Sequence, residues 1–303
     1  MQVIYSPVPL LSTTVRTPML GGMSALFDAA LYKPLMGGQL KLTIHLKIRL
    51  VPLAPTGLDL PDNTGQRFVT SPWNPDEWQK FVASAAAQAN MWNNRFWLVP
   101  PHTFFEFDVV KPPNSSYRPN IRCELAVDFM PRKGTEHTSV LVMHLDESRL
   151  APPKDGGSFG SAALLWDSLD GVPSLNPYSG SPTSLSYTIA HEIGHLLGLE
   201  HIGVMMTTKA CIRSLLHRLQ GTPDDRVDRL EAGGEHSLYC YGLGLSRQGK
   251  PMGANVMGMG SDFTFENASP WVRAIRLMRE RWFEPWRVTL TDPGPGTWIV
   301  PQR

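Results

Sequence analysis

The segment that most constrains this chain runs from His191 to His201 and reads HEIGHLLGLEH. On a helix, His191 and His195 are one turn apart and project from the same face, so both imidazoles can reach one metal ion. Gly198 is expected to end the helix, because glycine adopts positive φ readily and lets the chain turn sharply. That turn returns His201 as the third ligand. Three neutral imidazoles leave one zinc position open for water, which is the arrangement of a catalytic site.

Glu192 stands next to the first ligand and is expected to be the general base. Its carboxylate can reach a zinc-bound water, take a proton from it and pass that proton to the leaving amine. Zinc lowers the pKa of such a water towards ~7 and polarises the scissile carbonyl. The sequence therefore predicts one catalytic Zn²⁺ ion, held by His191, His195 and His201, with Glu192 as the catalytic residue.

The helix that carries these residues is predicted to begin at Ser181-Pro182, since serine is a good N-cap and proline fits the first helical turn. Its face opposite the ligands is apolar and is expected to pack on the core. That face comprises Leu185, Ile189, Ile193 and Leu196.

With this motif the chain resembles the metzincin clan of zinc peptidases, whose signature is HExxHxxGxxH. All the fixed positions match, and the local sequence is very similar to the matrixin form of the motif. The resemblance implies an α+β fold with two subdomains. The upper one has a twisted mixed β-sheet and two long helices, the second of which carries the motif. The smaller lower one is mainly helical or irregular, with a Met-turn beneath the zinc and then a C-terminal helix.

Met257 is the best candidate for the Met-turn that the resemblance implies, and Met259 is the fallback. Met257 follows the third ligand, His201, by 257 − 201 = 56 residues, which is longer than the matrixin spacing. Met205 and Met206 follow the same ligand too closely to pass under the site. The expected role of Met257 is structural.

Three features separate the chain from particular metzincin subfamilies, so no subfamily is assigned. Met259 replaces the tyrosine that follows the turn in astacin-like and serralysin-like enzymes, and Tyr239 and Tyr241 precede the turn. No cysteine-switch segment is visible, and Cys123 is expected to be a buried thiol in a strand. Asp155–Gly160 is similar to a matrixin calcium loop but lacks the neighbouring structural-zinc histidine, so a Gly-rich turn is favoured over a calcium site.

The distribution of these signals predicts the domain organisation. Residues 1–38, rich in Pro, Gly and small side chains, are expected to be an irregular lead-in; residues 39–201 are the upper catalytic subdomain, and residues 202–303 the lower subdomain. Alternating or short apolar runs predict strands. These strands are 41–52, 104–110, 121–130, 139–145 and 161–166.

Two further helices have clear start signals. Asn74 is a good N-cap, with proline in the first turn and Glu77 completing a capping-box pattern, and an apolar face continues to Trp92. Ser269-Pro270 repeats the serine–proline start, and an apolar stripe continues from there to Trp282.

Charge and hydropathy argue against two classes of partner. The formal net charge of +1 offers no electrostatic footprint for nucleic acid. No stretch approaches the ~18 consecutive apolar residues of a membrane span. No signal peptide is recognisable, so the location is left open between the cytoplasm and export by a signal-independent route.

The three cysteines allow a Cys211–Cys240 disulfide, and three free thiols including Cys123 are an equal alternative.

A zinc-dependent metalloendopeptidase is the leading hypothesis, with a protein or peptide substrate paired to an exposed edge strand at Ser139–Leu145. A zinc amidase acting on cell-wall peptide would use the same catalytic residues. An exported bacterial effector or toxin protease, restrained by a proteinaceous inhibitor or immunity partner, is a further alternative. A non-catalytic zinc-containing binding module is the fourth, and Glu192 argues against it because a structural site needs no base.

Overall fold

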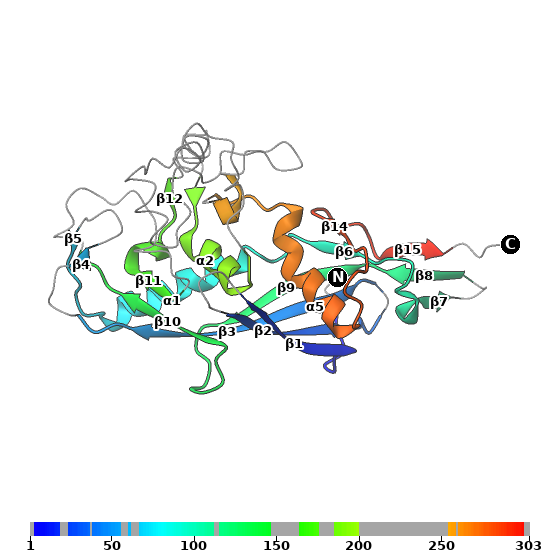
Figure 1. Ribbon diagram of the computed structural model, residues 1–303, viewed down its shortest axis with the longest axis horizontal. Helices are drawn as coiled ribbons and strands as arrows, with labels where there is room; N and C mark the ends of the chain where they lie inside the picture. Colours follow the sequence, from blue (N-terminus) through cyan, green and yellow to red (C-terminus); the bar gives the residue numbers. More distant parts are fainter. Residues whose placement is uncertain are drawn as a thin grey trace, which may run out of the picture.

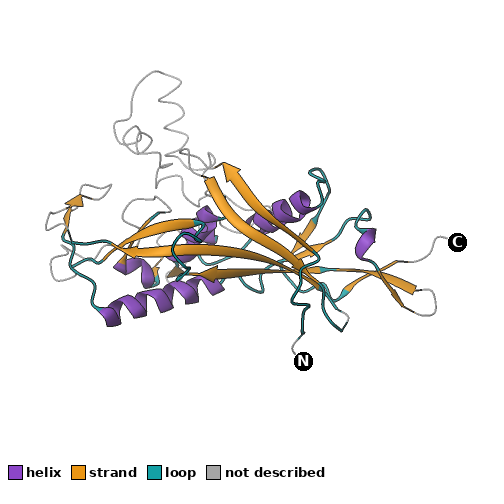
Figure 2. Ribbon diagram, turned by 90° about the horizontal axis from the view of Figure 1, so that it is seen from below, coloured by secondary structure: helices purple, strands orange, loops and turns teal. Residues whose placement is uncertain are grey.

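The structure is a computed structural model of the 303-residue chain. It describes residues 3–18, 24–36, 38–55, 60–61, 67–111, 115–146, 164–175, 185–199, 254–258 and 260–299. Within these stretches the chain is an α+β protein, in which a twisted mixed β-sheet packs against α-helices (Figure 1). The long strands run along the long axis of the molecule (Figure 2). The predicted α+β class and mixed sheet are therefore confirmed.

The main sheet mixes parallel and antiparallel pairs. Its described strands are β1 (Leu11–Pro18), β2 (Ser24–Tyr32), β3 (Leu40–Pro52), β6 (Trp97–Val99), β9 (Ile121–Asp128), β10 (Thr138–Met143), β11 (Leu165–Asp167) and β14 (Arg287–Thr289). The order is β1-β2-β3-β9-β6-β14, and residues 48–52 of β3 pair with β10, which pairs with β11 on its other side. The β3–β9, β3–β10 and β10–β11 pairs are parallel, and the others are antiparallel.

Shorter elements surround this sheet. The remaining described strands are β4 (Leu60–Pro61) with β5 (Arg67–Phe68), β7 (Val109–Lys111) with β8 (Ser115–Pro119) and β15 (Gly296–Ile299), and β12 (Ser174–Leu175) with β13 (Leu185–Ser186). The described α-helices are α1 (Pro75–Asn90), α2 (Thr188–Leu196) and α5 (Ser269–Met278). The described 3-10 helices are η2 (Phe105–Phe107), η4 (Ser168–Gly171), η7 (Val256–Gly258) and η8 (Phe265–Ala268).

Strand β3 forms where the sequence predicted it, and its alternation defines the core face of the sheet. Leu42, Ile44 and Leu46 are fully buried, whereas His45 and Lys47 are half-buried on the opposite face, where Thr43 is also buried. Because successive side chains of a strand point to opposite faces, this pattern places one apolar face of β3 against the helices.

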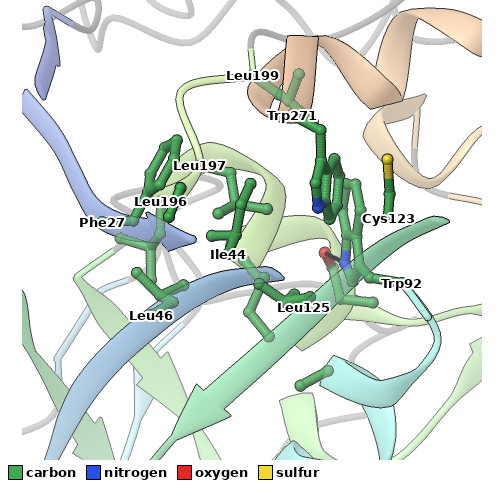
Figure 3. Close-up of a cluster of buried hydrophobic side chains, with 14 of the residues drawn as sticks. Phe27, Ile44, Leu46, Trp92, Cys123, Leu125, Leu196, Leu197, Leu199 and Trp271 are labelled. Atoms are coloured by element: carbon green, nitrogen blue, oxygen red, sulfur yellow. Dashed lines mark hydrogen bonds between the residues drawn. The ribbon is translucent and has the colours of Figure 1, made fainter. Parts of the chain in front are cut away.

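The helices close the core over that face. Figure 3 shows Ile44 of β3 near Leu197, at the end of α2, with Trp92 and Trp271 beside them. Trp92 follows α1 and Trp271 belongs to α5, and their ring centroids are 6.3 Å apart. The end of α2 therefore lies over the core face of the sheet, beside Trp92 and Trp271.

Helix α1 begins at the predicted cap. The side chain of Asn74 accepts a hydrogen bond from the backbone N–H of Glu77 at 2.8 Å, and Pro75 occupies the first turn. Phe81 and Ala85 are buried, so the predicted apolar face does pack on the core.

The prediction of an irregular lead-in over residues 1–38 was wrong. Residues 11–18 and 24–32 form β1 and β2, which pair antiparallel with each other, and β2 also pairs with β3. Within β2, Phe27, Ala29 and Leu31 alternate into the core. The high content of proline and glycine around these runs concealed their alternation.

The predicted beginning of the motif helix was also wrong. Ser181 and Pro182 lie outside the described residues, but Leu185 belongs to strand β13 and the helix begins only at Thr188. Pairing of β13 with β12 extends the backbone there, so Leu185 cannot contribute to the apolar face of the helix. The buried residues Ile189, Ile193 and Leu196 do contribute to it.

Residues 104–110 are a 3-10 turn followed by the short strand β7, not one strand. Phe104 and Phe107 are three residues apart, and their ring centroids lie 4.7 Å apart. That spacing places both rings on one side of a 3-10 turn, because side chains three residues apart align there.

Strand β10 is not the exposed edge that was expected at Ser139–Leu145. It lies between β3 and β11, and is parallel to both. The apolar pattern of a strand indicates which residues are buried but not how many strands flank it, so the sequence could not distinguish these positions.

The C-terminal helix begins at Ser269 with Pro270 in its first turn, one residue before the predicted start, because Ala268 is the N-cap in place of Ser269. It ends at Met278, before Trp282. After it, β14 pairs with β6 and so joins the main sheet. The domain boundary at residue 201 stays a prediction, but these later elements share the core of the earlier ones.

Candidate metal centre

Helix α2 places His191 and His195 side by side. Their Nε2 atoms are 3.1 Å apart, and the two ring planes meet at 86°. The residues are four apart, which is slightly more than one helical turn, so both side chains project from one face. The two Nε2 atoms are therefore close enough to bind the same ion.

Backbone carbonyls fix how each ring is protonated. Nδ1 of His191 lies 2.7 Å from the carbonyl oxygen of Val256, and Nδ1 of His195 lies 2.8 Å from that of Leu199. A carbonyl oxygen can only accept a hydrogen bond, so each Nδ1 carries the proton and donates it. In a neutral ring, Nε2 then has a lone pair that can bind a metal.

The electrostatic environment keeps both rings neutral. Burial, together with the neighbouring His195, lowers the pKa of His191 to about 3. Burial also lowers the pKa of His195 below its ordinary value. At neutral pH two Nε2 lone pairs therefore face each other, an arrangement that a cation between them would stabilise.

The distance between these nitrogens fits a zinc ion. Two imidazole nitrogens bound at ~2.0–2.1 Å with a tetrahedral angle lie ~3.3 Å apart. The observed 3.1 Å is close to that value. The described residues bring together no group of three or more metal-binding side chains, and the expected third ligand, His201, lies outside them. The two described histidines thus fit the ion, and the third remains a prediction.

Glu192, the expected base, is buried on α2 beside His191, with 3% of its surface exposed. Burial of a carboxylate costs free energy unless polar or charged groups compensate.

Gly198 ends the helix in the way that was predicted. It has a positive φ of 82°. Its N–H donates to the carbonyl of His195 at 2.8 Å, and the N–H of Leu199 donates to the carbonyl of Gly194 at 3.0 Å. These two bonds form a Schellman motif, which requires a left-handed residue at the position of Gly198. The same turn brings the carbonyl of Leu199 back onto Nδ1 of His195, so the end of the helix orients its own last histidine.

Met257 lies directly against the backbone of the motif helix. It belongs to η7 and is 0% exposed. A β-carbon at Gly194 would lie 2.1 Å from its Sδ, 3.0 Å from its Cε and 3.2 Å from Cζ2 of Trp92. Because ordinary contacts between heavy atoms are ~3.5–4.0 Å, only glycine fits between these side chains. The thioether therefore packs on α2 at Gly194, the residue before His195.

Gln88 of α1 supplies the cap that α2 lacks in its own sequence. Tyr187 precedes the helix and gives no side-chain cap. The buried Gln88 accepts hydrogen bonds from the N–H groups of Ile189 and Ala190 at 3.0 and 3.3 Å, and donates one to the carbonyl of Asp170 at 2.8 Å. One side chain thus satisfies N–H groups that the first turn of any helix leaves without helical partners.

Trp92 holds the next backbone group of α2. Its indole Nε1–H donates to the carbonyl of Ala190 at 3.0 Å. Gln88 and Trp92 are four residues apart, so both face α2 from the same side of α1 and the turn after it. Together they fix the helix immediately before His191.

A buried polar network shapes the turn that contains Met257. The side chain of Asn255 accepts from Met257 N at 2.8 Å and Asn267 Nδ2 at 3.2 Å, and donates to Thr264 Oγ1 at 3.1 Å and Asn267 Oδ1 at 2.9 Å. All three of these polar side chains are buried. Every donor and acceptor of the Asn255 amide is therefore satisfied inside the protein.

Sequence reasoning missed the supporting residues. Trp92 was assigned to core packing alone, and Gln88 could have been noticed as a polar residue within the apolar stripe of α1. Asn255 lies next to the predicted turn, but its partners, Thr264 and Asn267, give no signal because their pairing depends on how the chain folds back.

Several sequence predictions fall outside the described residues. These are the third ligand His201, the fallback Met259, the alternatives Met205 and Met206, Tyr239 and Tyr241, the Cys211–Cys240 pair, and the Asp155–Gly160 loop. Cys123 is described: it is a buried free thiol in β9, as expected, and burial raises its pKa well above the ordinary value.

Away from the candidate site, Asp28 links β1, β2 and β3 on the outer face of the sheet. Its carboxylate accepts hydrogen bonds from Thr14 Oγ1 at 2.8 Å and Lys47 Nζ at 3.2 Å, and lies 3.1 Å from His137 Nε2. Partial burial acts to raise the pKa of Asp28, but these hydrogen bonds outweigh it and lower that pKa.

No helix in the described part of the chain is long and apolar enough to cross a membrane.

Comparison of the chain with protein-family models, with curated proteins and with solved structures gave no match in any of the three.

Proposed function

We propose that this protein is a zinc-dependent metalloendopeptidase of the metzincin type, a hydrolase that cleaves peptide bonds. His191, His195 and His201 would hold the ion, and Glu192 would act as general base. The observation that carries the proposal is the 3.1 Å approach of the two Nε2 atoms, with each Nδ1 directed at a carbonyl oxygen. Two imidazoles oriented in this way are arranged as ligands of one ion.

The bound metal, Glu192 and two backbone carbonyls would each have a separate role in the reaction. Bound zinc would supply a Lewis acid and an acidified water. Glu192 takes the proton from the attacking water and returns it to the leaving amine. The carbonyls of Val256 and Leu199 keep both imidazoles in the tautomer with a lone pair on Nε2.

The arrangement of elements supports the metzincin type as well as the zinc chemistry. A twisted mixed sheet, a long helix α1 and a second helix with the motif occur in the order that the resemblance implies. A tight turn with Met257 packs on the motif helix, and α5 follows it. A peptide substrate could add to the sheet on the side of β11, the outermost described strand next to β10.

Metal analysis combined with cleavage of a peptide library tests the proposal. Wild type and Glu192→Gln should each bind about one zinc per chain, because Glu192 is not a ligand. Loss of the base should lower the rate of cleavage by about 10²–10⁴-fold. Glu280→Gln, at an exposed glutamate, is the matched control and should cleave as wild type does.

Each result decides a different part of the proposal. Equal cleavage by Glu192→Gln would remove Glu192 as the base. Absence of zinc from the wild-type protein would overturn the function as a whole. Unchanged zinc affinity in His201→Ala would show that another residue is the third ligand.

A further inference from the structure

We propose that Asn255 is a positioning residue for the metal centre: its side chain fixes the peptide group whose carbonyl orients His191. This inference rests on the proposed function, because the orientation of His191 matters for function only if its ring binds a metal. Asn255 itself touches neither ring, and acts through the peptide bond between Val256 and Met257.

The geometry of that peptide bond carries the inference. In a trans peptide, the N–H and the C=O point in opposite directions. The N–H of Met257 donates to Oδ1 of Asn255 at 2.8 Å, and the carbonyl of Val256, in the same peptide group, accepts from Nδ1 of His191 at 2.7 Å. Holding one end of the peptide group therefore determines the direction of the other.

The Asn255 side chain is itself held on all sides. Its Nδ2 donates to Thr264 and Asn267, and its Oδ1 also accepts from Asn267. Its backbone carbonyl accepts from the N–H groups of Gly258 and Gly260 at 2.8 and 2.7 Å. An amide bonded at every polar atom cannot rotate without losing several hydrogen bonds, so it is a rigid anchor for the peptide group.

Asn255 affects His191 through the hydrogen bond between the His191 ring and the Val256 carbonyl. With the Val256 carbonyl in place, the proton of the neutral ring stays on Nδ1 and the lone pair stays on Nε2. If the peptide group could rotate, the ring could take the other tautomer, and the Nε2 atom that faces His195 would carry a proton. Partners that orient a histidine ligand in this way typically contribute about 10–100-fold to metal affinity.

Three variants separate positioning from general stability. Asn255→Ala removes the acceptor for the Met257 N–H. Asn255→Asp keeps an oxygen at that place and loses the donors, so it should retain the direction of the peptide group despite lower stability. Asn120→Ala is the matched control, because Asn120 is equally buried and donates to the carbonyl of Gly294 at 3.0 Å, in another part of the fold.

Two measurements are made on each full-length protein. The first is the dissociation constant for zinc, from competition with a chromophoric chelator. The second is the tautomer of His191 in the zinc-free protein, from the nitrogen chemical shifts of its ring. We expect Asn255→Ala to bind zinc about 10–100-fold more weakly and to lose the single Nδ1–H tautomer. Asn255→Asp should largely restore both, and Asn120→Ala should change neither.

Opposite outcomes overturn the inference. Wild-type zinc affinity and an unchanged tautomer in Asn255→Ala would show that the network only stabilises the fold. If Asn255→Ala does not fold, Asn267→Ala replaces it, because it removes two of the bonds that hold the Asn255 amide; unchanged affinity there has the same meaning. Absence of zinc from wild type would overturn the proposed function, whereas the tautomer measurement would still decide whether Asn255 positions His191.

Discussion

Substitution of Gly194 by alanine tests the packing of Met257 against the motif helix. The new β-carbon would lie 2.1 Å from Met257 Sδ, so the sulfur would have to move by roughly 1.5 Å to reach an ordinary contact. Met257 is fully buried, and overpacking of a buried side chain costs about 1–3 kcal/mol. Alanine in place of glycine within a helix returns at most ~1 kcal/mol. With that return subtracted, the variant should be less stable by up to about 2 kcal/mol.

The sign of the effect should reverse when the sulfur is absent. In a Met257→Ala background, Gly194→Ala should stabilise the protein by up to ~1 kcal/mol, because only the helix preference remains. Trp92 Cζ2, 3.2 Å from the new atom, is present in both backgrounds and reduces that gain. Urea unfolding of all four proteins measures the coupling, which we expect to equal the overpacking cost of about 1–3 kcal/mol, because the helix preference is the same in both backgrounds. Independent, additive effects of the two substitutions would refute the proposed contact.

Three further predictions concern the stability of the fold, two near the site and one away from it. Gln88→Ala should lower the free energy of unfolding in urea by roughly 1–3 kcal/mol, since it leaves two buried N–H groups of α2 without their acceptor; a loss under ~0.5 kcal/mol would contradict this. Gly198→Ala should lower it by about 1–2 kcal/mol, because alanine is strained at φ 82°; Gly198→Asn, which tolerates that region better, should lose less. The pKa of Asp28 is lowered in the folded state, so the folded state binds fewer protons there than the unfolded chain. The contribution of the Asp28 charge to the free energy of unfolding is therefore fully present above the unfolded pKa of ~3.9. It disappears as the pH falls through the lower folded pKa. The difference in thermal midpoint between wild type and Asp28→Asn should therefore shrink below about pH 4, and a constant difference down to pH 2 would show that the charge of Asp28 contributes nothing.

Local patterns predicted the elements that depend on local chemistry. The alternation of β3, the Asn74 cap of α1, the Ser269-Pro270 start of α5 and the positive φ of Gly198 all follow from short-range preferences. The neighbourhood of His191 and His195 follows from helical spacing alone. These features require no knowledge of which segments meet in the folded chain.

The wrong predictions concern segments whose structure depends on residues far away in the sequence. Strand β10 was expected at an edge because its own sequence does not reveal that β11 pairs beside it. The start of α2 was placed too early because a cap was sought in the preceding residues, whereas Gln88, about a hundred residues upstream, provides it. Residues 24–32 become a strand by pairing with β3, and residues 11–18 by pairing with residues 24–32, which their own composition does not indicate.

The rings of His191 and His195 are oriented by hydrogen bonds to residues at very different separations along the sequence. The carbonyl that holds His195 is four residues away and comes into place when α2 and its terminal turn form. The carbonyl that holds His191 is 65 residues away in sequence, so its arrival requires closure of a long loop and docking of η7 on the helix. Contacts of large sequence separation form slowly, whereas a helical turn forms in about a microsecond or less. During refolding, the ring of His195 should therefore be oriented early, and the ring of His191 only when η7 has docked on α2.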